Sequence, residues 1–385
     1  MFTSKTAIVF LAFCLALVNA VPVHQHHRRA CRANSGVAAS NSTTSNSTTT
    51  AAGTAPTETG KPETIVKANT NTTSVDAPKS SKTTSDAVAE PTPSKSSASS
   101  FITKAHKLAE LFPVSKFSKS WSTSPFADNA LPLSDSTLRP TRLLKALSHD
   151  YVSAPDGKKA MKAHFPKGSY TYTHQPQGGL SFYAPGPSSL DLSTAKEATF
   201  GYAVYFEEGF AFNLGGKLPG LYGGNSDAEA LSCSGGRRST ACFSARLMWR
   251  AAGAGEFYTY LPPYTDSRFA ANKKQCSVAP KSDCNPTYGA SVGRGAFTWP
   301  TGKWTTISER VRLNDVGKAN GELELFVNGK SVINVDGLII RDSAAGRIRG
   351  IQMQTFFGGS KPEYASPKDQ NVFFADFSAA ITQSL

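Results

Sequence analysis

Two short segments of the chain place potential acid, base and anion-binding side chains at alternate positions. Ser244 and Arg246 are two residues apart in CFSARLMWR, and Tyr258 and Tyr260 are two residues apart in EFYTYL. Both segments alternate like β-strands, in which side chains two positions apart point to the same face. A guanidinium binds a carboxylate through a planar two-pronged contact, and a tyrosine can accept or donate a proton. Together these groups suit chemistry on an anionic sugar.

A short glycine- and alanine-rich link over residues 251–255 predicts that the two strands pair as a β-hairpin. If these five residues form the loop, Arg246 lies opposite Tyr260 and Met248 lies opposite Tyr258. Directly opposed side chains are about 5 Å apart at Cβ. A guanidinium and a phenol at that spacing can share one carboxylate.

The first of these strands differs in character between its two faces. The apolar face, which we expect in the core between two sheets, consists of Phe243, Ala245, Leu247 and Trp249. The opposite face carries Ser244, Arg246, Met248 and Arg250. A solvated outer face is the usual role of such a surface, but its arginines and tyrosines favour a concave groove for a polysaccharide.

Alternating residues predict an all-β fold, a jelly-roll β-sandwich of antiparallel strands, over most of the chain after residue 169. The dipeptide Asn328-Gly329 indicates a hairpin turn of type I′. Two short helices are expected earlier, at residues 101–112, where Pro113 would end the helix, and at residues 141–149. The predicted strands cover residues 198–206, 243–250, 257–261, 304–313, 322–327, 350–357 and 372–379.

The first 100 residues have the composition of processed and unfolded segments. Residues 1–20 contain Lys5, an apolar run and small residues at the end, which indicates a secretory signal peptide. Residues 21–100 are rich in Ser, Thr, Ala, Pro and Lys, which is typical of a disordered, glycosylated linker. Three N-glycosylation sequons lie there, at Asn41, Asn46 and Asn71. We therefore expect a secreted, extracellular protein with no membrane association.

The expected organisation has four parts. A signal peptide (1–20) precedes the disordered Ser/Thr-rich linker (21–100), a short helical lead-in (101–160) and the jelly-roll domain (161–385). Within the linker, Arg28-Arg29 is either a dibasic processing site or an accidental basic pair.

The cysteine positions predict two local disulfides. Cys233 and Cys242 flank one loop, and Cys276 and Cys284 flank another. In an oxidising compartment such neighbouring cysteines form disulfides. A zinc site fits less well, because neither pair has C-x-x-C spacing and no histidine is nearby. Cys31 is left unpaired.

The net charge of +13 favours a polyanionic partner. Secretion argues against nucleic acid, so we expect an acidic polysaccharide as the substrate of a monomer that needs no cofactor and no metal ion. Solubility alone explains the lysines of the linker. It explains less well the arginines in the middle of the folded part, which are Arg237, Arg238, Arg246, Arg250, Arg268, Arg294, Arg310 and Arg312.

Two hydrolytic chemistries fit the sequence poorly. All seven histidines lie at or before His174, so the strand-rich part has none for a Ser-His-Asp or Cys-His arrangement. Glycoside hydrolysis needs a pair of carboxyl groups around the bond. Glu322 and Glu324 form such a pair, but we expect them to face solvent beside the predicted hairpin, and Glu207 and Glu208 are merely adjacent in sequence.

The chain from about Lys167 to Phe377 resembles polysaccharide lyase family 14, the alginate and glucuronan lyases. The resemblance is carried, in family order, by the segments PKGSY, GGKLPGLYGG, CFSARLMWR, EFYTYLP, GKWTTI, RVRLND, VNGKSV and TFFGG. It implies a β-jelly-roll fold and cleavage by β-elimination. The functional residues that it implies, with no departure from the family pattern, are Lys217, Ser244, Arg246, Tyr258 and Tyr260.

Elimination from a 4-linked uronate removes the C5 proton and breaks the C4–O bond, leaving an unsaturated sugar. We expect Arg246, helped by Lys217, to stabilise charge on the carboxylate, the two tyrosines to exchange protons with C5 and O4, and Ser244 to orient the substrate. Glucuronate and mannuronate share their configuration at C4 and C5, so both require syn elimination. The alternative function is a noncatalytic carbohydrate-binding module, which has no need of the tyrosine pair.

Overall fold

The structure, a computed structural model, describes residues 104–105, 107–285 and 287–385. The expectations for the signal peptide, the linker with its sequons and basic pair, and Cys31 concern residues outside this range.

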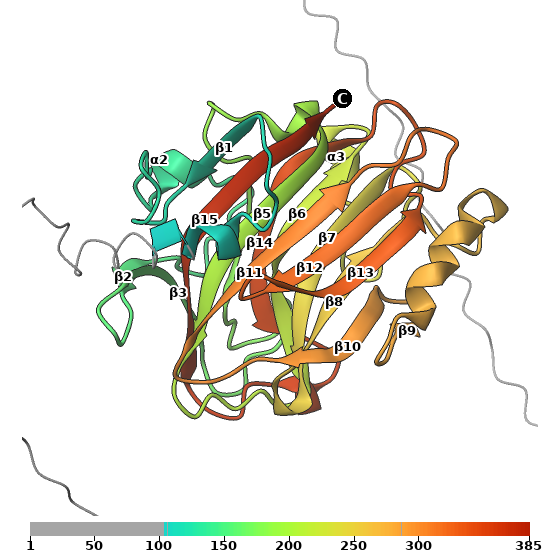
Figure 1. Cartoon of the computed structure of the whole chain (residues 1–385). Coiled ribbons are helices and arrows are strands. Elements are labelled where there is room, and N and C mark those ends of the chain that lie inside the picture. The colour runs from blue at the N-terminus through green and yellow to red at the C-terminus, as the bar shows by residue number, and fades with distance from the viewer. Residues whose placement is uncertain (1–103, 106, 286) are drawn as a thin grey trace, which may run out of the picture. The chain divides into compact units, whose positions relative to one another are not determined.

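Strands in the described residues form two antiparallel sheets, here called sheet A and sheet B (Figure 1). Sheet A has the order β13 (Lys330–Leu338), β12 (Gly321–Val327), β11 (Trp304–Arg312), β5 (Ala195–Phe206), β15 (Gln370–Ser384), β3 (Lys159–Phe165) and β2 (Tyr151–Ser153), and β1 (Lys119–Ser122) also pairs with β15. Sheet B has the order β4 (Leu180–Ala184), β14 (Arg347–Phe357), β6 (Gly215–Gly224), β7 (Cys242–Arg250), β8 (Ala254–Tyr260), β10 (Ala290–Thr298) and β9 (Asp283–Cys284). The predicted all-β sandwich is confirmed.

Helices in the described residues are short and peripheral. They are the α-helices α2 (Asp135–Leu138) and α3 (Asp227–Ala230) and the 3₁₀ segments Leu192–Thr194, Ala251–Gly253, Ser267–Ser277 and Pro362–Tyr364. Residues 107–111 are also helical, and this helix ends before Pro113 as predicted. The helix predicted at residues 141–149 is wrong. The backbone of Thr141 instead bonds to Tyr183 of β4 in both directions, so this segment runs along a sheet edge.

The core lies between the two sheets and is rich in aromatic side chains. Trp249 of β7 packs against Phe206 of β5 and Phe165 of β3, with ring centroids 5.6 and 6.0 Å apart. All three rings are almost fully buried. Because two of them come from sheet A and one from sheet B, these contacts join the layers, as apolar inner faces do in β-sandwiches.

The two faces of β7 separate as predicted. Phe243, Ala245, Leu247 and Trp249 all lie in the core between the sheets. Ser244, Arg246, Met248 and Arg250 therefore point to the other side of sheet B, because successive side chains of a strand alternate. The same alternation places Tyr258 and Tyr260 of β8 on that outer side.

β6, which carries Lys217, was not predicted as a strand because its sequence, GGKLPGLYGG, is rich in glycine and contains Pro219. Proline cannot donate a ladder hydrogen bond, and the pairing of β6 with β7 shifts register between Leu218 and Leu221. Gly216 is required by packing, since a Cβ there would lie 2.0 Å from the Trp249 ring. β6 is therefore a bulged central strand of sheet B, and its Gly216 makes room for the Trp249 ring of β7.

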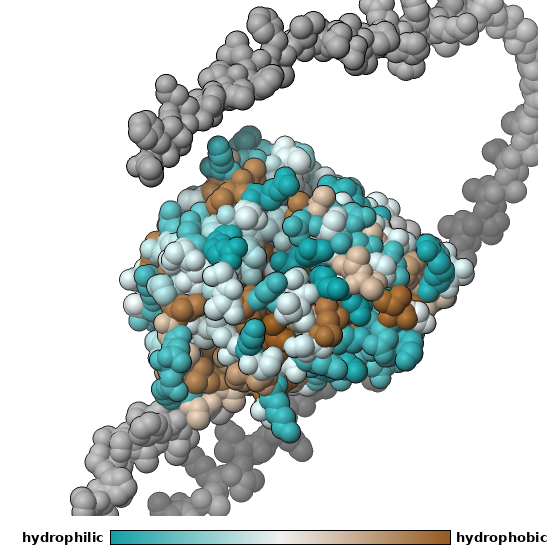
Figure 2. Space-filling view, turned by 90° about the horizontal axis from the view of Figure 1, so that it is seen from above, coloured by the Kyte–Doolittle hydropathy of each residue, from teal (hydrophilic) through white to brown (hydrophobic). Residues whose placement is uncertain are grey.

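The predicted turn at Asn328-Gly329 joins β12 and β13, and both residues have positive φ, 48° and 76°, as type I′ requires. The carboxylates considered for hydrolysis, Glu322 and Glu324, lie on β12 in sheet A and pair with Arg310 at 2.9 Å each. They belong to the sheet that does not carry the tyrosine pair. The surface seen in Figure 2 is mostly polar, with small apolar patches between polar residues.

Candidate active site

A cavity of about 770 Å³ lies on the outer face of sheet B. Four of the five predicted functional residues line it: Lys217 from β6, Arg246 from β7, and Tyr258 and Tyr260 from β8. Further lining comes from the glycine-rich turn after β14 and from loops beside β10. The predicted residues of three consecutive, neighbouring strands thus meet in one cavity.

The pairing of β7 with β8 differs from the predicted register. Arg246 lies opposite Tyr258, and Ser244 lies opposite Tyr260. The reason is the hairpin loop, which contains only the three residues of Ala251–Gly253 rather than five. A loop shorter by two residues moves each partner by two positions and keeps every side chain on its face. The predicted face is therefore correct, although the predicted pairs are wrong.

Arg246 is a buried cation with no acidic partner among the described residues. The residue is 1% exposed. Its Nη1 donates to Oε1 of Gln354 at 3.1 Å, and its Nε has no hydrogen-bond partner. Buried charges are normally paired, because removing them from water is costly. An unpaired guanidinium lining a cavity is therefore prepared to receive an anion.

Tyr258 lies at the centre of the cationic side chains of the cavity. The Nζ of Lys217 is 4.1 Å from the centroid of its ring, and the Tyr260 ring meets it edge-on at 5.8 Å. The amide of Gly289 donates to its hydroxyl oxygen at 3.2 Å. Burial raises the pKa of Tyr258, and the neighbouring Tyr260 adds to this effect while Arg246 opposes it. The phenol is therefore held in its protonated form.

Tyr260 has a different environment at its hydroxyl. The backbone N–H of Gly236 donates to this oxygen at 2.9 Å. Gly236 lies in the loop between Cys233 and Cys242, and these two cysteines form the predicted disulfide, with a Cα–Cα distance of 5.7 Å. A backbone amide from this disulfide-closed loop therefore contacts the Tyr260 oxygen.

The amine of Lys217 is surrounded by other cations. Burial lowers the pKa of Lys217 well below its usual value, and Arg250 and Arg246 lower it further, while Glu256 acts in the opposite direction. Its Nζ lies between the rings of Tyr258 and Phe356, the latter at 5.7 Å. A lysine in such a site can act as a neutral base.

Ser244 is the predicted residue that does not line the cavity. It is 1% exposed, and its hydroxyl donates to the carbonyl oxygen of Cys233 at 2.8 Å. The serine therefore fixes the start of the loop that contacts Tyr260.

Several polar residues at the cavity were not among the predicted functional residues. Arg250, which was predicted on the outer face of β7, lines the cavity, as do Ser291 and Arg294 of β10. Glu256 is fully buried and pairs with both arginines, and the alternation of β8 was a signal for its position on the outer face. The second disulfide, Cys276–Cys284, is confirmed at a Cα–Cα distance of 5.3 Å.

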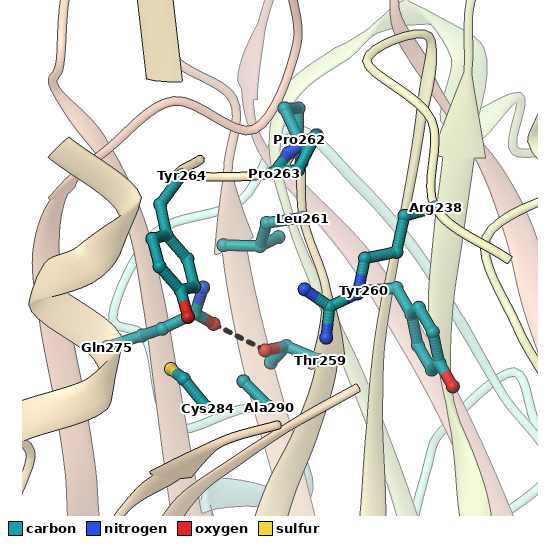
Figure 3. Close-up of a pocket in the computed structure, with 10 residues that line it drawn as sticks. All are labelled: Arg238, Thr259, Tyr260, Leu261, Pro262, Pro263, Tyr264, Gln275, Cys284 and Ala290. Atoms are coloured by element: carbon teal, nitrogen blue, oxygen red, sulfur yellow. Dashed lines mark hydrogen bonds between the residues drawn. The ribbon is translucent and has the colours of Figure 1, made fainter. Parts of the chain in front are cut away.

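A much smaller cavity of about 10 Å³ lies against the other side of β8 (Figure 3). There Thr259 donates a hydrogen bond to Gln275 at 2.5 Å, and the Tyr260 side chain points away from this pair. The volume suffices for about one water molecule, so it is no site for a sugar.

Among the described residues, no group of three or more His, Cys, Asp or Glu side chains is arranged to hold a metal ion. No helix in this part of the chain is long and apolar enough to cross a membrane.

Comparison with known proteins agrees with the resemblance noted from the sequence. The family model of Polysaccharide lyase 14 matches residues 153–377. The chain is similar to the marine PL-14 alginate lyase from Aplysia kurodai, with 32% identity, a TM-score of 0.57, and coverage of 69% of this chain and 100% of that chain. It is also similar to alginate lyase vAL-1 from Chlorella virus, with 26% identity, a TM-score of 0.50, and coverage of 61% and 89%. A search among curated proteins gave no match.

The family match spans more than half of the chain, and the fold and the strand-borne cavity agree with it. The chain therefore belongs to polysaccharide lyase family 14 and is a polysaccharide lyase.

Proposed function

We propose that this lyase is secreted and cleaves 4-linked uronic acid polymers, alginate or glucuronan, by syn β-elimination. The unpaired Arg246 guanidinium carries the proposal. It lines the cavity next to two phenols, and among the described residues it has no carboxylate partner. A uronate supplies the missing carboxylate. The two similar proteins named above are both alginate lyases by their titles.

The reaction needs a stabilised carboxylate, a base and an acid on one side of the sugar. As C5 loses its proton, negative charge develops on the carboxylate, and Arg246 stabilises it through a two-pronged contact. The C5 electron pair forms the C4=C5 double bond, the C4–O4 bond breaks, and O4 takes up a proton.

Tyr258 is assigned as the acid that protonates O4. Burial keeps its proton in place in the free enzyme, and it lies directly opposite Arg246 on the neighbouring strand. Two groups beside it are candidates for the base. They are the amine of Lys217, whose pKa is lowered, and the hydroxyl of Tyr260, whose ring meets the Tyr258 ring edge-on. Either can take the C5 proton from the same face, as syn elimination requires.

Ser244 is assigned a positioning role rather than contact with the sugar. Its hydroxyl is already engaged by the Cys233 carbonyl and lies below the cavity. The sequons and the signal peptide support secretion, as do the two disulfides.

The test is incubation of the purified protein with polymannuronate, polyguluronate and glucuronan, followed by ultraviolet absorbance. Only elimination makes the conjugated C4=C5 product, so a rise in absorbance on polymannuronate or glucuronan supports the proposal. Guluronate has the opposite configuration at C5, so a rise on polyguluronate alone would contradict syn elimination. Binding of these polymers without any absorbance change would instead indicate a noncatalytic carbohydrate-binding module.

A further inference from the structure

A second cationic group borders the cavity beside Tyr258, and none of its residues is assigned to the proton transfers proposed above. Arg250 from β7 and Ser291 and Arg294 from β10 line the cavity, and Glu256 from β8 is fully buried against them. Arg250 and Arg294 bind opposite oxygens of the Glu256 carboxylate. The Nε of Arg250 lies 2.8 Å from Oε1, and the Nε of Arg294 lies 2.9 Å from Oε2.

The group is rigid at its base and open toward the cavity. Glu256 is fully buried, whereas the side chains of Arg250 and Arg294 are 19% and 25% exposed. Each arginine uses Nε and Nη2 to bind Glu256 or Ser291. Among the described residues, neither Nη1 group has a hydrogen-bond partner. Two fixed donors are therefore left for a ligand.

The charges of this group do not cancel. Two guanidinium groups share one carboxylate, which leaves one positive charge. A structural ion pair would need only one of the arginines, because a single guanidinium satisfies a buried carboxylate. The excess positive charge also acts on Lys217, because Arg250 contributes to lowering the pKa of this amine.

The position of the group matches a ligand with repeated charges. Arg246 and Arg250 lie four residues apart on one face of β7, which corresponds to about 13 Å along the strand. The Arg250 guanidinium is 5.8 Å from the Tyr258 ring, on the same side as Glu256. An anion bound at Arg250 and Arg294 would therefore lie in the same cavity as one bound at Arg246, but displaced from it along β7.

We propose that Arg250 and Arg294, held by Glu256, form a second subsite that binds the carboxylate of a uronate further along the same polysaccharide chain. This inference rests on the proposed function. It makes the cavity selective for polymers with charge on successive sugars over a chain with a single uronate at the cleavage point.

The test compares Arg294→Gln with the wild-type protein on a uronan that the wild type cleaves. Arg294→Gln removes the charge and the guanidinium donors of this residue, while Arg250 still pairs with Glu256. We expect KM to rise about tenfold with kcat changed by less than about twofold, and the dependence of KM on salt to become weaker. A merely structural role would lower kcat or the melting temperature instead.

Arg268→Gln is the matched control, because Arg268 pairs with Asp266 on the surface and does not line the cavity. It should leave KM unchanged. If Arg294→Gln folds poorly, affinity can be measured with Arg294→Lys in the Tyr258→Phe background with a uronan tetrasaccharide. Lys keeps the charge but not the fixed guanidinium donor, so affinity should fall severalfold, and unchanged affinity would count against the subsite.

A folded Arg294→Gln variant with unchanged KM and unchanged salt dependence would overturn the subsite. Failure of the wild type to cleave any uronan would overturn the proposed function itself, so the two failures are distinguishable.

Discussion

The backbone N–H of Gly236 donates a 2.9 Å hydrogen bond to the hydroxyl oxygen of Tyr260. Gly236 lies in the loop closed by Cys233–Cys242, and the carbonyl of Cys233 accepts the hydroxyl of Ser244. One disulfide-closed loop thus contacts two of the five predicted functional residues. If Tyr260 takes the C5 proton, we predict that this amide stabilises the negative charge that develops on its oxygen.

Replacing both cysteines of this loop with alanine (Cys233→Ala with Cys242→Ala) should reduce stability by roughly 2–3 kcal/mol. It should also lower kcat about 10- to 100-fold, because a hydrogen bond to a charged group contributes about 1.5–3 kcal/mol. Chemical denaturation and initial rates measured well below the melting temperature separate the two effects.

The control is the pair Cys276→Ala with Cys284→Ala, which opens a loop of similar length and should cost similar stability. Equal kcat values for the two double variants would contradict the proposed role of the Gly236 amide.

Three single substitutions assign the proton-transferring groups. Tyr258→Phe, Tyr260→Phe and Lys217→Met each remove one polar group with little change in volume. Loss of the acid or the base should lower kcat by roughly 10²–10⁴, so Tyr258→Phe and one of the other two should show this effect. The remaining variant should retain more activity. If all three folded variants turn over uronans at near-normal rates, the mechanism is wrong.

Arg246→Ala should lower kcat by roughly 10²–10³, because it removes the donor to the charge that develops on the carboxylate. Arg246→Lys should recover only part of this loss, since lysine lacks the planar fork. Steady-state kinetics measures both. The control is Arg312→Ala on sheet A, where Arg312 pairs with Glu322 at 2.7 Å and should not influence the rate. Full activity of Arg246→Lys would indicate that only charge is needed.

The site was predictable to the extent that it follows alternation along single strands. The residues of β7 and β8 lie on the predicted faces, because side chains alternate whatever the register. The opposed pairs were not predictable. They depend on a three-residue hairpin loop in which Ala252 and Gly253 adopt positive φ, 56° and 75°, and the sequence allowed a five-residue loop equally well.

Glu256 shows a different limit of sequence reasoning. Its partners, Arg250 and Arg294, are 6 and 38 residues away. The second contact depends on the register of β10, which shifts between Val292 and Phe297. No local pattern predicts such a bulge, so a fully buried glutamate on the outer face cannot be told in the sequence from an exposed one. The arginine-rich composition indicated an anion-binding surface but not its geometry.

The segment expected to be a helical lead-in contributes strands to sheet A, and we predict that the fold needs it. β1 pairs with β15, and Trp121 of β1 is 4% exposed. A chain starting at residue 104 should therefore retain activity, whereas one starting at residue 150 should be strongly destabilised. Trp121→Ala should cost about 3–5 kcal/mol, measured by urea denaturation. Wild-type stability of the shorter chain would refute this.

Glu309 lies in the core behind the active site and is 1% exposed. Its Oε1 accepts the N–H of Leu221 at 2.5 Å, beside the β6 bulge, and its Oε2 has no hydrogen-bond partner. Burial raises the pKa of this carboxyl well above its usual value, and the Leu221 amide only partly opposes the shift. The folded state therefore binds a proton that the unfolded state releases above about pH 4.3.

Stability should consequently fall as pH rises from about 4.3 toward the raised pKa, by at most about 1.4 kcal/mol per pH unit from this group. Glu309→Gln keeps an acceptor for the Leu221 N–H and cannot ionise. Its free energy of unfolding relative to that of the wild type should therefore increase with pH across this range. Urea denaturation of both proteins at several pH values gives the difference, in which all other titrations cancel. Glu309→Leu, which leaves the Leu221 N–H unpaired, should be about 1–3 kcal/mol less stable than Glu309→Gln at every pH. Parallel pH profiles for the wild type and Glu309→Gln would show that Glu309 keeps an ordinary pKa in the fold.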